Sequence, residues 1–467
     1  MDLLTELKSA LGAEQVLTGA DAAPYLTDWR GRYTGSAYAV TRPANTHEVA
    51  QVVKLCRRYG APIVPQGGNT GLAGGATPDG SGRAVVISTR RLDRLRAIDT
   101  DNDTITVEAG CVLQTVQDWA RQAGRLFPLS LASEGSCTVG GNLATNAGGT
   151  QVLRYGNARE LALGLEVVTA EGEVWDGLRG LRKDNTGYDL RNLYIGSEGT
   201  LGIITAATLR LFPLPKAQCT AMVSLPSLEA AVALLNQARA GLGADLTGFE
   251  VMSYASLEVV TRAFPDQKLP LPAAPWYALL EVSDSESEEH AQARFQEVLQ
   301  AAVEQGTVED AVVASSIAQS RALWLLRENI SAAQAWEGKN IKHDISVPTS
   351  RIAAFVAATD AMLQAAVPGV RHITFGHLGD GNLHYNVSRP PEIPEADFLA
   401  RQDEVYRLVH DSVHAHGGSI SAEHGIGQLK REEMARYKSA LELDLMHRIK
   451  RALDPEGLMN PGKILPP

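Results

Sequence analysis

Two histidines in one predicted hairpin are the residues of this chain whose type and spacing point most directly to chemistry. The segment Ile373–Val387, ITFGHLGDGNLHYNV, has an Asp-Gly pair between two apolar runs, a strong signal for a two-residue turn. That turn would pair His377 with His384 and leave their Cβ atoms roughly 5 Å apart on one face. Two imidazoles at this separation can share a divalent metal ion, and a third candidate ligand lies in the downstream stretch 421–425, SAEHG. The hairpin by itself favours the plainer interpretation of two ordinary histidines. Whether they bind a metal therefore depends on what the rest of the chain indicates.

The first two hundred residues combine short apolar segments with glycine-rich turns, which predicts a mixture of strands and helices. Thr46–Tyr59 has the apolar spacing of an amphipathic helix, and Gly60 is placed to end it at the C′ position. Strands are predicted at 61–65, 84–88, 104–108, 163–168 and 203–211, with a second helix at 112–123. Residues 212–215, FPLP, are typical of a linker. Beyond it, helices are predicted at 228–240, 286–304, 311–328, 352–367 and 398–416, and a strand at 276–282.

Three glycine-rich segments are candidates for ligand binding. Residues 67–75 follow a predicted buried strand, and their glycines would let successive backbone N–H groups approach a phosphate. The segments 132–149 and 195–203 combine glycines with small polar residues, which can line a flat ligand with main-chain contacts. The dinucleotide fingerprint GxGxxG is absent, so a Rossmann-type site is not supported.

The bulk composition is that of a globular chain with two or three domains: 467 residues, of which 44% are apolar and 21% charged. A net charge of −11 argues against a nucleic-acid partner or an anionic membrane surface. The cysteines, Cys56, Cys111, Cys137 and Cys219, have no paired spacing, which favours reduced thiols. The N-terminal segment is acidic and amphipathic rather than typical of a signal peptide, and no run reaches the length of a membrane span. We therefore expect a cytoplasmic protein without a transmembrane segment.

The longest motifs of the chain are PQGGNTGLAGG, ASEGSCTVGGNLATNAGG and GSEGTLGIIT, which resemble the FAD-binding domain of the vanillyl-alcohol oxidase superfamily. GHLGDGNLH, SAEHGIG and the terminal NPGK narrow the resemblance to the FAD-linked D-2-hydroxyacid dehydrogenases, of the D-2-hydroxyglutarate, D-lactate and glycolate oxidase types. The resemblance extends from about Arg42 onward. It implies an α+β fold: an FAD-binding domain (1–214, PCMH type) of two α+β subdomains, and a substrate domain (215–420) with an antiparallel sheet flanked by helices. A C-terminal segment (421–467) would return to the FAD domain.

The resemblance also assigns flavin contacts, which fall in the three glycine-rich segments and near the C-terminus. Covalent members of the superfamily carry a histidine in the first glycine loop, where this chain has Gly67-Gly68-Asn69-Thr70, so we expect non-covalent FAD. The implied contacts are Pro65, Gln66, Gly67, Gly68, Asn69, Thr70, Gly71 and Leu72 at the pyrophosphate; Ser133, Gly135, Gly140, Asn142, Thr145, Gly148 and Gly149 at the flavin and ribityl chain; Glu198, Gly199 and Ile204 at the adenosine end; and Asn460.

By the same resemblance, His377, His384 and Glu423 are ligands of a divalent metal, zinc or manganese, and His424 is the general base. Coordination of the substrate hydroxyl to the cation would lower its pKa. A neutral His424 would then take the proton while the α-hydrogen leaves as hydride to the flavin N5.

Arg327, Ser331 and Lys342 lie in segments that resemble the substrate-carboxylate region of the D-2-hydroxyglutarate branch, and Asn386 and His424 are further implied substrate contacts. A bidentate arginine beside a lysine suits a second carboxylate. The chain departs from that branch at Ser331, where threonine is usual, and at His343, where an aromatic residue is usual. These departures bear on the particular substrate rather than on the reaction.

The expected activity is FAD- and metal-dependent oxidation of a D-2-hydroxyacid to the 2-oxoacid, with D-2-hydroxyglutarate as the leading substrate. The alternatives are a D-lactate or D-malate dehydrogenase, a glycolate oxidase FAD subunit, a non-catalytic flavoprotein subunit, and an oxidase that passes electrons to oxygen. The resemblance further implies an electron acceptor such as an electron-transfer flavoprotein or a quinone, and it allows a homodimer.

Overall fold

A computed structural model describes residues 2–466, and the chain divides into two compact units. The first unit comprises Met1–Gly149, Gly156–Leu214 and Glu423–Pro467, and the second comprises Thr150–Tyr155 and Pro215–Ala422. The short segment Thr150–Tyr155, which contains α5 (Val152–Tyr155), therefore packs with the second unit although its flanking residues belong to the first.

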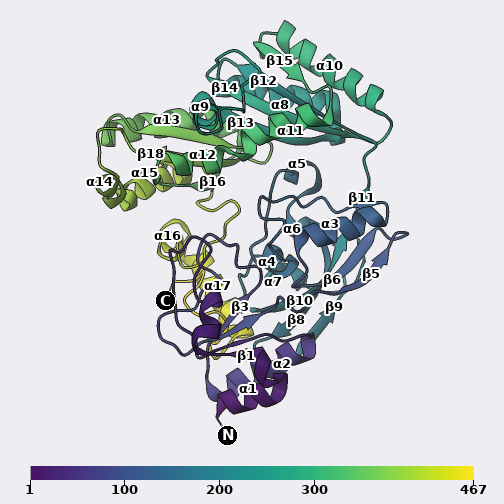
Figure 1. Ribbon diagram of the computed structural model, residues 1–467, viewed down its shortest axis with the longest axis vertical. Coiled ribbons are helices and arrows are strands. Elements are labelled where there is room, and N and C mark those ends of the chain that lie inside the picture. The colour runs from purple at the N-terminus through teal and green to yellow at the C-terminus, as the bar shows by residue number, and fades with distance from the viewer. Residues whose placement is uncertain (1, 467) are drawn as a thin grey trace. The chain divides into compact units, whose positions relative to one another are not determined.

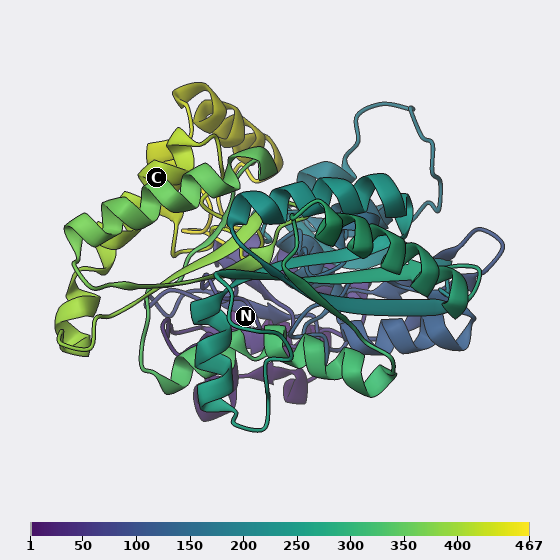
Figure 2. The same cartoon turned by 90° about the horizontal axis from the view of Figure 1, so that it is seen from above.

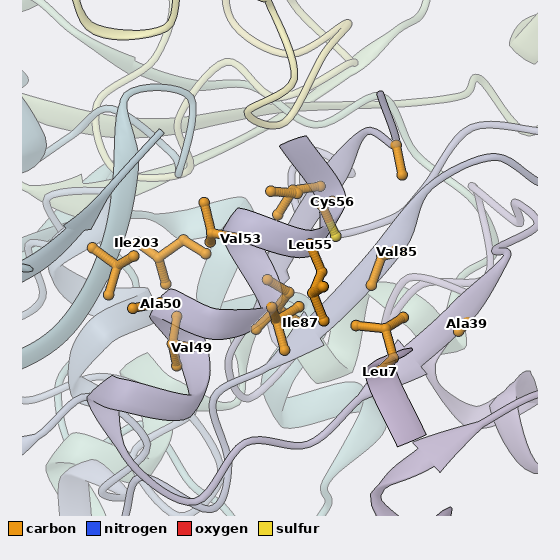
Figure 3. Close-up of a cluster of buried hydrophobic side chains, with 14 of the residues drawn as sticks. Leu7, Ala39, Val49, Ala50, Val53, Leu55, Cys56, Val85, Ile87 and Ile203 are labelled. Atoms are coloured by element: carbon orange, nitrogen blue, oxygen red, sulfur yellow. The ribbon is translucent and has the colours of Figure 1, made fainter. Parts of the chain in front are cut away.

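The first sheet of the first unit has the strand order β1-β2-β4-β3, labelled in part in Figure 1. Its strands are β1 (Val16–Leu17), β2 (Ala39–Thr41), β4 (Val85–Ser88) and β3 (Ile63–Gln66), of which the last three run parallel. Helices α1 (Leu3–Leu11) and α2 (Thr46–Tyr59) pack with it, and α2 ends at Gly60 in the left-handed conformation, as predicted. Figure 3 shows their shared core, in which Val53 and Cys56 of α2 meet Val85 and Ile87 of β4.

The second sheet of the first unit is antiparallel, with the order β5-β6-β10-β8-β9. Its strands are β5 (Leu95–Asp99), β6 (Thr104–Glu108), β10 (Gly202–Arg210), β8 (Ala162–Thr169) and β9 (Val174–Gly177). The helices of this region are α3 (Leu113–Gln122), α4 (Val139–Ala144), α6 (Ala158–Leu161) and α7 (Arg191–Tyr194), and β7 (Arg125–Leu126) pairs with β11 (Phe212–Pro213). The predicted linker at 212–215 thus begins as a short strand.

The C-terminal segment completes the first unit. After α16 (Arg431–Tyr437) and α17 (Ala440–Leu453), the chain runs beside β3: Ile63 N–H donates to Leu458 O, and Asn460 N–H donates to Ile63 O, both at 2.8 Å. Met459 between them is fully buried in the same hydrophobic core as Val85 and Ile87.

The second unit is one seven-stranded antiparallel sheet in the order β15-β12-β14-β13-β17-β18-β16. The strands are β12 (Ala217–Leu225), β13 (Leu246–Ser253), β14 (Trp276–Asp284), β15 (Asp310–Val313), β16 (Asp344–Ser346), β17 (Arg371–His377) and β18 (Asn382–Ser388). Helices α9 (Tyr254–Ala263), α11 (Ile317–Glu328) and α12 (Ile330–Trp336) cover one face, around Met222, Met252 and Phe375. Helices α8 (Leu228–Leu242) and α10 (Glu288–Glu304) cover the other, and Figure 2 shows helices on both sides of the sheet. The remaining helices are α13 (Ile352–Ala366), α14 (Glu395–Ala400) and α15 (Gln402–Ala415).

The predicted hairpin at 373–387 forms, but its register differs by two residues from the predicted one. Phe375, not His377, lies opposite His384, so the predicted direct pairing of the two histidines is wrong. The turn is longer than Asp-Gly alone, because Asp380 N–H donates to His377 O and the Asp380 carboxylate accepts from Asn382 N–H at 3.1 Å. Gly376 permits this register, since a Cβ there would lie 2.4 Å from the Asn382 carbonyl oxygen. A shift of two residues preserves the side-chain alternation, so His377 and His384 still share a face.

Two predicted helices are wrong in part. Residues 311–328 begin as the edge strand β15, which pairs with β12, and the helix α11 starts after Ser316, whose side chain accepts from Gln319 N–H. The consecutive valines at 312–313 suit a strand better than a helix. Residues 398–416 form two helices, α14 and α15, interrupted at Arg401. The other predicted strands and helices are present, with ends within two residues of those predicted. Within residues 2–466, every helix is too short or too polar to cross a membrane.

Candidate active site

One face of the sheet in the second unit collects ionisable side chains along β13, β17, β18 and β16. Glu250 lies opposite His377, and His384 lies opposite Asp344. Together with the β17–β18 register, these pairings place all four side chains on the same face of the sheet. Strands far apart in sequence therefore build one polar cluster.

Glu250 is the centre of this cluster and is fully buried. One carboxylate oxygen is 2.5 Å from His377 Nδ1, and the other accepts from Arg327 Nε at 2.6 Å. Burial opposes ionisation of Glu250, but the neighbouring His377 and Arg327 outweigh burial and lower its pKa to about 2. Because the carboxylate is ionised, His377 must carry a proton on Nδ1 to donate to it.

The two histidines fit a divalent cation. Their ring centroids are 5.7 Å apart, and Phe375 packs against His384 with a centroid distance of 5.0 Å. Since Nδ1 of His377 donates its proton to Glu250, the lone pair of the ring is on Nε2, which is the nitrogen that would bind a metal. A carboxylate behind a histidine is the usual support of a metal-bound imidazole.

The predicted substrate contacts in the second unit lie in different environments. Arg327, in the last turn of α11, is 8% exposed, and its guanidinium carbon lies 4.8 Å from the Phe375 ring centroid. Ser331 is exposed on α12, and Lys342 is half-buried just before β16. The side chain of Asn386 is buried on β18, where it accepts from His343 N–H at 3.3 Å and donates to Gln334 Oε1 at 3.0 Å. The structure brings Arg327 together with His377, through Glu250.

In the first unit, the glycine loop after β3 presents unpaired backbone donors. Within residues 2–466, the N–H groups of residues 68–72 donate to no protein acceptor, and the buried hydroxyl of Thr138 has no partner. The loop is held by Gln66 and Asn69, whose side-chain amides donate to Tyr25 O and Thr27 O, both at 2.9 Å. A run of free N–H groups on a fixed loop fits the phosphates of FAD.

Some of the other predicted flavin residues of the first unit lie against this loop or the residues that flank it. Gly68 packs against the second glycine segment, since a Cβ there would lie 2.3 Å from Ser136 O. Gly199 packs against Pro65, and the Asn460 amide donates to Gly75 O at 2.9 Å and to Glu198 O at 2.7 Å. Ser133 and Gly135 lie in the loop before α4, Gly140 and Asn142 within α4, Thr145 at its end, Gly148 and Gly149 after it, and Ile204 on β10.

Glu198 is buried in the first unit, with its carboxylate turned to the SAEHGIG segment. Its oxygens accept from Ile426 N–H at 2.7 Å and from Gly427 N–H at 2.9 Å. Burial raises its pKa to about 7, although these N–H groups and the charges of Lys463 and Lys430 oppose the rise. The predicted contact of Glu198 with adenosine stays a prediction.

Glu423 and His424 stand where the chain leaves the second unit for the first. In the second unit, Ala422 N–H donates to Asp344 O at 3.4 Å, and Asp344 lies opposite His384 in the sheet. Glu423 is the next residue of the chain after Ala422. In the first unit, the Glu423 carboxylate accepts from Gly149 N–H at 2.7 Å. The predicted third metal ligand is therefore anchored to a predicted flavin segment.

Sequence reasoning missed Glu250 and gave no role to Asp344. A signal for Glu250 was present: it is the one charged residue of LTGFEVMS, which forms a strand buried on both faces. A charge in such a strand needs a partner. The partner itself, 127 positions away at His377, follows from strand pairing and not from local sequence.

Comparison with known proteins shows to which class of protein this chain belongs. Residues 37–177 match the FAD binding domain and residues 214–464 match the C-terminal domain of FAD linked oxidases. The fold resembles p-cresol methylhydroxylase (TM-score 0.77, 16% identity, 99% of this chain and 96% of that chain) and alkyldihydroxyacetonephosphate synthase (TM-score 0.72, 18% identity, 98% and 84%). The predicted fold class is confirmed, and the protein is an FAD-linked oxidoreductase.

The relatives narrow the class further. The chain is 40% identical to D-2-hydroxyglutarate dehydrogenase of Xanthomonas citri pv. viticola, over 99% of this chain and 96% of that protein. It is 36% identical to the mitochondrial D-2-hydroxyglutarate dehydrogenase of Bos taurus, over 100% of this chain and 84% of that protein. The chain belongs to the FAD-linked D-2-hydroxyacid dehydrogenases.

Proposed function

We propose that this protein oxidises D-2-hydroxyglutarate to 2-oxoglutarate with FAD and a divalent cation. The observation that carries the proposal is that Arg327 and His377 share the two oxygens of one buried carboxylate, Glu250. A candidate carboxylate-binding group and a candidate metal ligand are thereby held on the same sheet face. The names of the bacterial and mitochondrial relatives support this substrate.

In this proposal, His377, His384 and Glu423 hold zinc or manganese, and residues 65–72 hold the FAD pyrophosphate. The glycine segments around α4 hold the flavin, with Glu198, Gly199, Ile204 and Asn460 as the remaining contacts. When bound, FAD accepts the α-hydrogen as hydride, and the cation lowers the pKa of the substrate hydroxyl.

The chain's own residues then bind substrate and move one proton. His424 removes the hydroxyl proton, the electron pair of the O–H bond becomes the second bond of the C=O group, and the α-hydrogen leaves with the two electrons of the C–H bond. Arg327 uses its Nε–H on Glu250, so its four Nη–H donors remain for the distal carboxylate of the substrate. Ser331, Lys342 and Asn386 are the further proposed substrate contacts.

The test is anaerobic mixing of the purified flavoprotein with D-2-hydroxyglutarate, D-lactate, D-malate and glycolate while flavin absorbance is followed. We expect D-2-hydroxyglutarate to bleach the flavin with the highest kcat/KM. Arg327→Met should lower kcat/KM for D-2-hydroxyglutarate by about 10–100-fold, since a charge-assisted bidentate contact is lost, and change D-lactate less. A clear preference for a monocarboxylate would contradict the substrate, and bleaching by none of them would indicate a non-catalytic subunit.

A second arm of the same experiment tests the metal. Activity should disappear after treatment with a chelator and return with zinc or manganese. Indifference to the chelator would contradict a metal-dependent reaction. Oxygen consumption during turnover separates a dehydrogenase, which we propose, from an oxidase.

The electron acceptor in this proposal is an electron-transfer flavoprotein or a quinone, and the assembly is a homodimer. The proposed location is the cytoplasm, which the four buried free cysteines support because reduced thiols are usual there.

A further inference from the structure

The feature that goes furthest beyond the proposed reaction is the position of Glu250 between two subsites. Its two oxygens have separate partners, His377 Nδ1 and Arg327 Nε, and strand pairing fixes Glu250 directly opposite His377. The side chain is inaccessible to solvent, so water cannot replace either contact. A buried carboxylate with one partner removed would be left with an unsatisfied oxygen.

Toward His377, the carboxylate determines which ring nitrogen can bind a cation. The contact at 2.5 Å requires a proton on Nδ1, which leaves the lone pair on Nε2. It also increases the electron density of the ring and fixes its orientation. A neutral amide in place of the carboxylate could instead donate to Nδ1, which would protonate Nε2 and block metal binding.

Toward Arg327, the same carboxylate neutralises a guanidinium that is 8% exposed. Phe375 lies against the guanidinium and also against His384, so the packing continues from the arginine to the second histidine. Without Glu250, an uncompensated arginine would share the sheet face with a divalent cation, and the two positive charges would repel each other.

We propose that Glu250 is a positioning residue that couples the metal subsite to the carboxylate subsite, by fixing the tautomer of His377 and the charge and orientation of Arg327. This inference rests on the proposed function and deepens it: metal affinity and preference for a dicarboxylic substrate depend on one buried side chain that touches neither ligand.

The test compares Glu250→Gln with wild type as FAD-loaded protein from which metal has been removed. Zinc affinity is measured by competition with a chromophoric chelator, which needs no turnover. We expect it to fall by about 10–100-fold, the range for loss of a carboxylate behind a metal-bound histidine. At saturating zinc, the ratio of kcat/KM for D-2-hydroxyglutarate to that for D-lactate should also fall, because Arg327 is misplaced.

The matched control is Glu281→Gln. Glu281 is a glutamate on the adjacent strand β14, opposite Gly248 and so on the same sheet face as Glu250, and it accepts from Trp324 Nε1 at 2.9 Å. The glutamine can still accept from Trp324, so zinc affinity and the substrate ratio should equal those of wild type. Should Glu250→Gln fail to fold, Glu250→Asp replaces it: the charge is kept, but the shorter side chain cannot reach both partners, and one of the two readouts should fall.

Zinc affinity within about twofold of wild type together with an unchanged substrate ratio, in the folded variant, would overturn the coupling. Failure of the proposed function is a different outcome, because wild type itself would then bind neither zinc nor manganese or would leave its flavin oxidised with every hydroxyacid. In Glu250→Gln, a fall in zinc affinity with an unchanged ratio would overturn the link to Arg327, and the reverse would overturn the link to His377; in Glu250→Asp, only the absence of both changes overturns the coupling.

Discussion

The sheet face around Glu250 and the glycine loop after β3 present opposite kinds of groups to a ligand. On the sheet face, charged side chains are matched inside the protein, with Glu250 between His377 and Arg327. In the loop, side chains such as Gln66 and Asn69 serve to hold the backbone, and the N–H groups of residues 68–72 have no acceptor within residues 2–466. The first region provides directed side-chain chemistry, whereas the second provides a positive surface that belongs to no particular side chain. The two regions should therefore fail under different substitutions.

The largest expected difference between the two regions is in His384→Ala, which changes the sheet face and leaves the glycine loop intact. Loss of one proposed ligand should lower zinc affinity by more than about 100-fold, the upper range for residues that only support a ligand, and abolish turnover. The flavin, held by the other region, should remain at wild-type stoichiometry. Chelator competition and the flavin absorbance of the purified protein measure the two effects.

The control is His372→Ala, because His372 lies on the same strand pair but its neighbours, Tyr385 and Asp360, are on the opposite face. The His372→Ala variant should bind zinc with the affinity of wild type. Equal zinc affinity in His384→Ala and wild type would show that His384 is not a metal ligand.

The converse change is Gly68→Ala. The new methyl group would lie 2.3 Å from Ser136 O, so the loop must shift away from the second glycine segment. We expect loss of bound FAD and a fall of about 1–3 kcal/mol in the free energy of unfolding, with zinc affinity retained. Flavin content after gel filtration and chemical denaturation give the two numbers.

Gly71→Ala is the matched variant, since no heavy atom lies within 4 Å of the added Cβ. Its stability should equal that of wild type. A Gly68→Ala protein that retains FAD as wild type does would show that the two glycine segments need not be in contact.

The smallest expected effect concerns Glu198. Its pKa is about 7 in the folded protein against an ordinary 4.5, so the folded state binds more protons between these values. Its contribution to stability should therefore decrease as the pH rises from about 4.5 to 7, by up to about 3 kcal/mol. Glu198→Gln does not titrate, so the difference in unfolding free energy, wild type minus variant, should decrease between pH 5 and pH 8.

Denaturant unfolding at several pH values measures this difference. A difference that is constant with pH would mean that Ile426 N–H, Gly427 N–H, Lys430 and Lys463 keep Glu198 ionised throughout.

Sequence periodicity predicted which face of a strand each histidine occupies, but not its partner across the sheet. His377 and His384 share a face because alternation has a period of two, and any even register shift preserves it. The register itself depends on the Asp380 turn and on the close approach of Gly376 to Asn382 O, neither of which is visible in an apolar pattern. The helix predicted at 311–328 was wrong in part for a related reason. Its first residues form the strand β15 because they pair with the edge of β12, which is far away in sequence.

The glycine segments were easier to find than to interpret. Their composition predicted ligand binding, yet some of their glycines are required because one segment packs closely on another, as at Gly68. Glu250 could not be assigned from sequence at all, because its role exists only where β13, β17 and α11 meet.

The position of Met459 has a consequence for the order of events during synthesis. The buried core that contains Leu7 of α1, labelled in Figure 3, also contains Met459. The chain must therefore be synthesised as far as Met459 before the first unit can complete this core. Asn460, which joins Gly75 and Glu198, arrives at the same moment. A nascent chain stalled before this point would contain all three glycine-rich segments but not the residue whose amide joins Gly75 to Glu198.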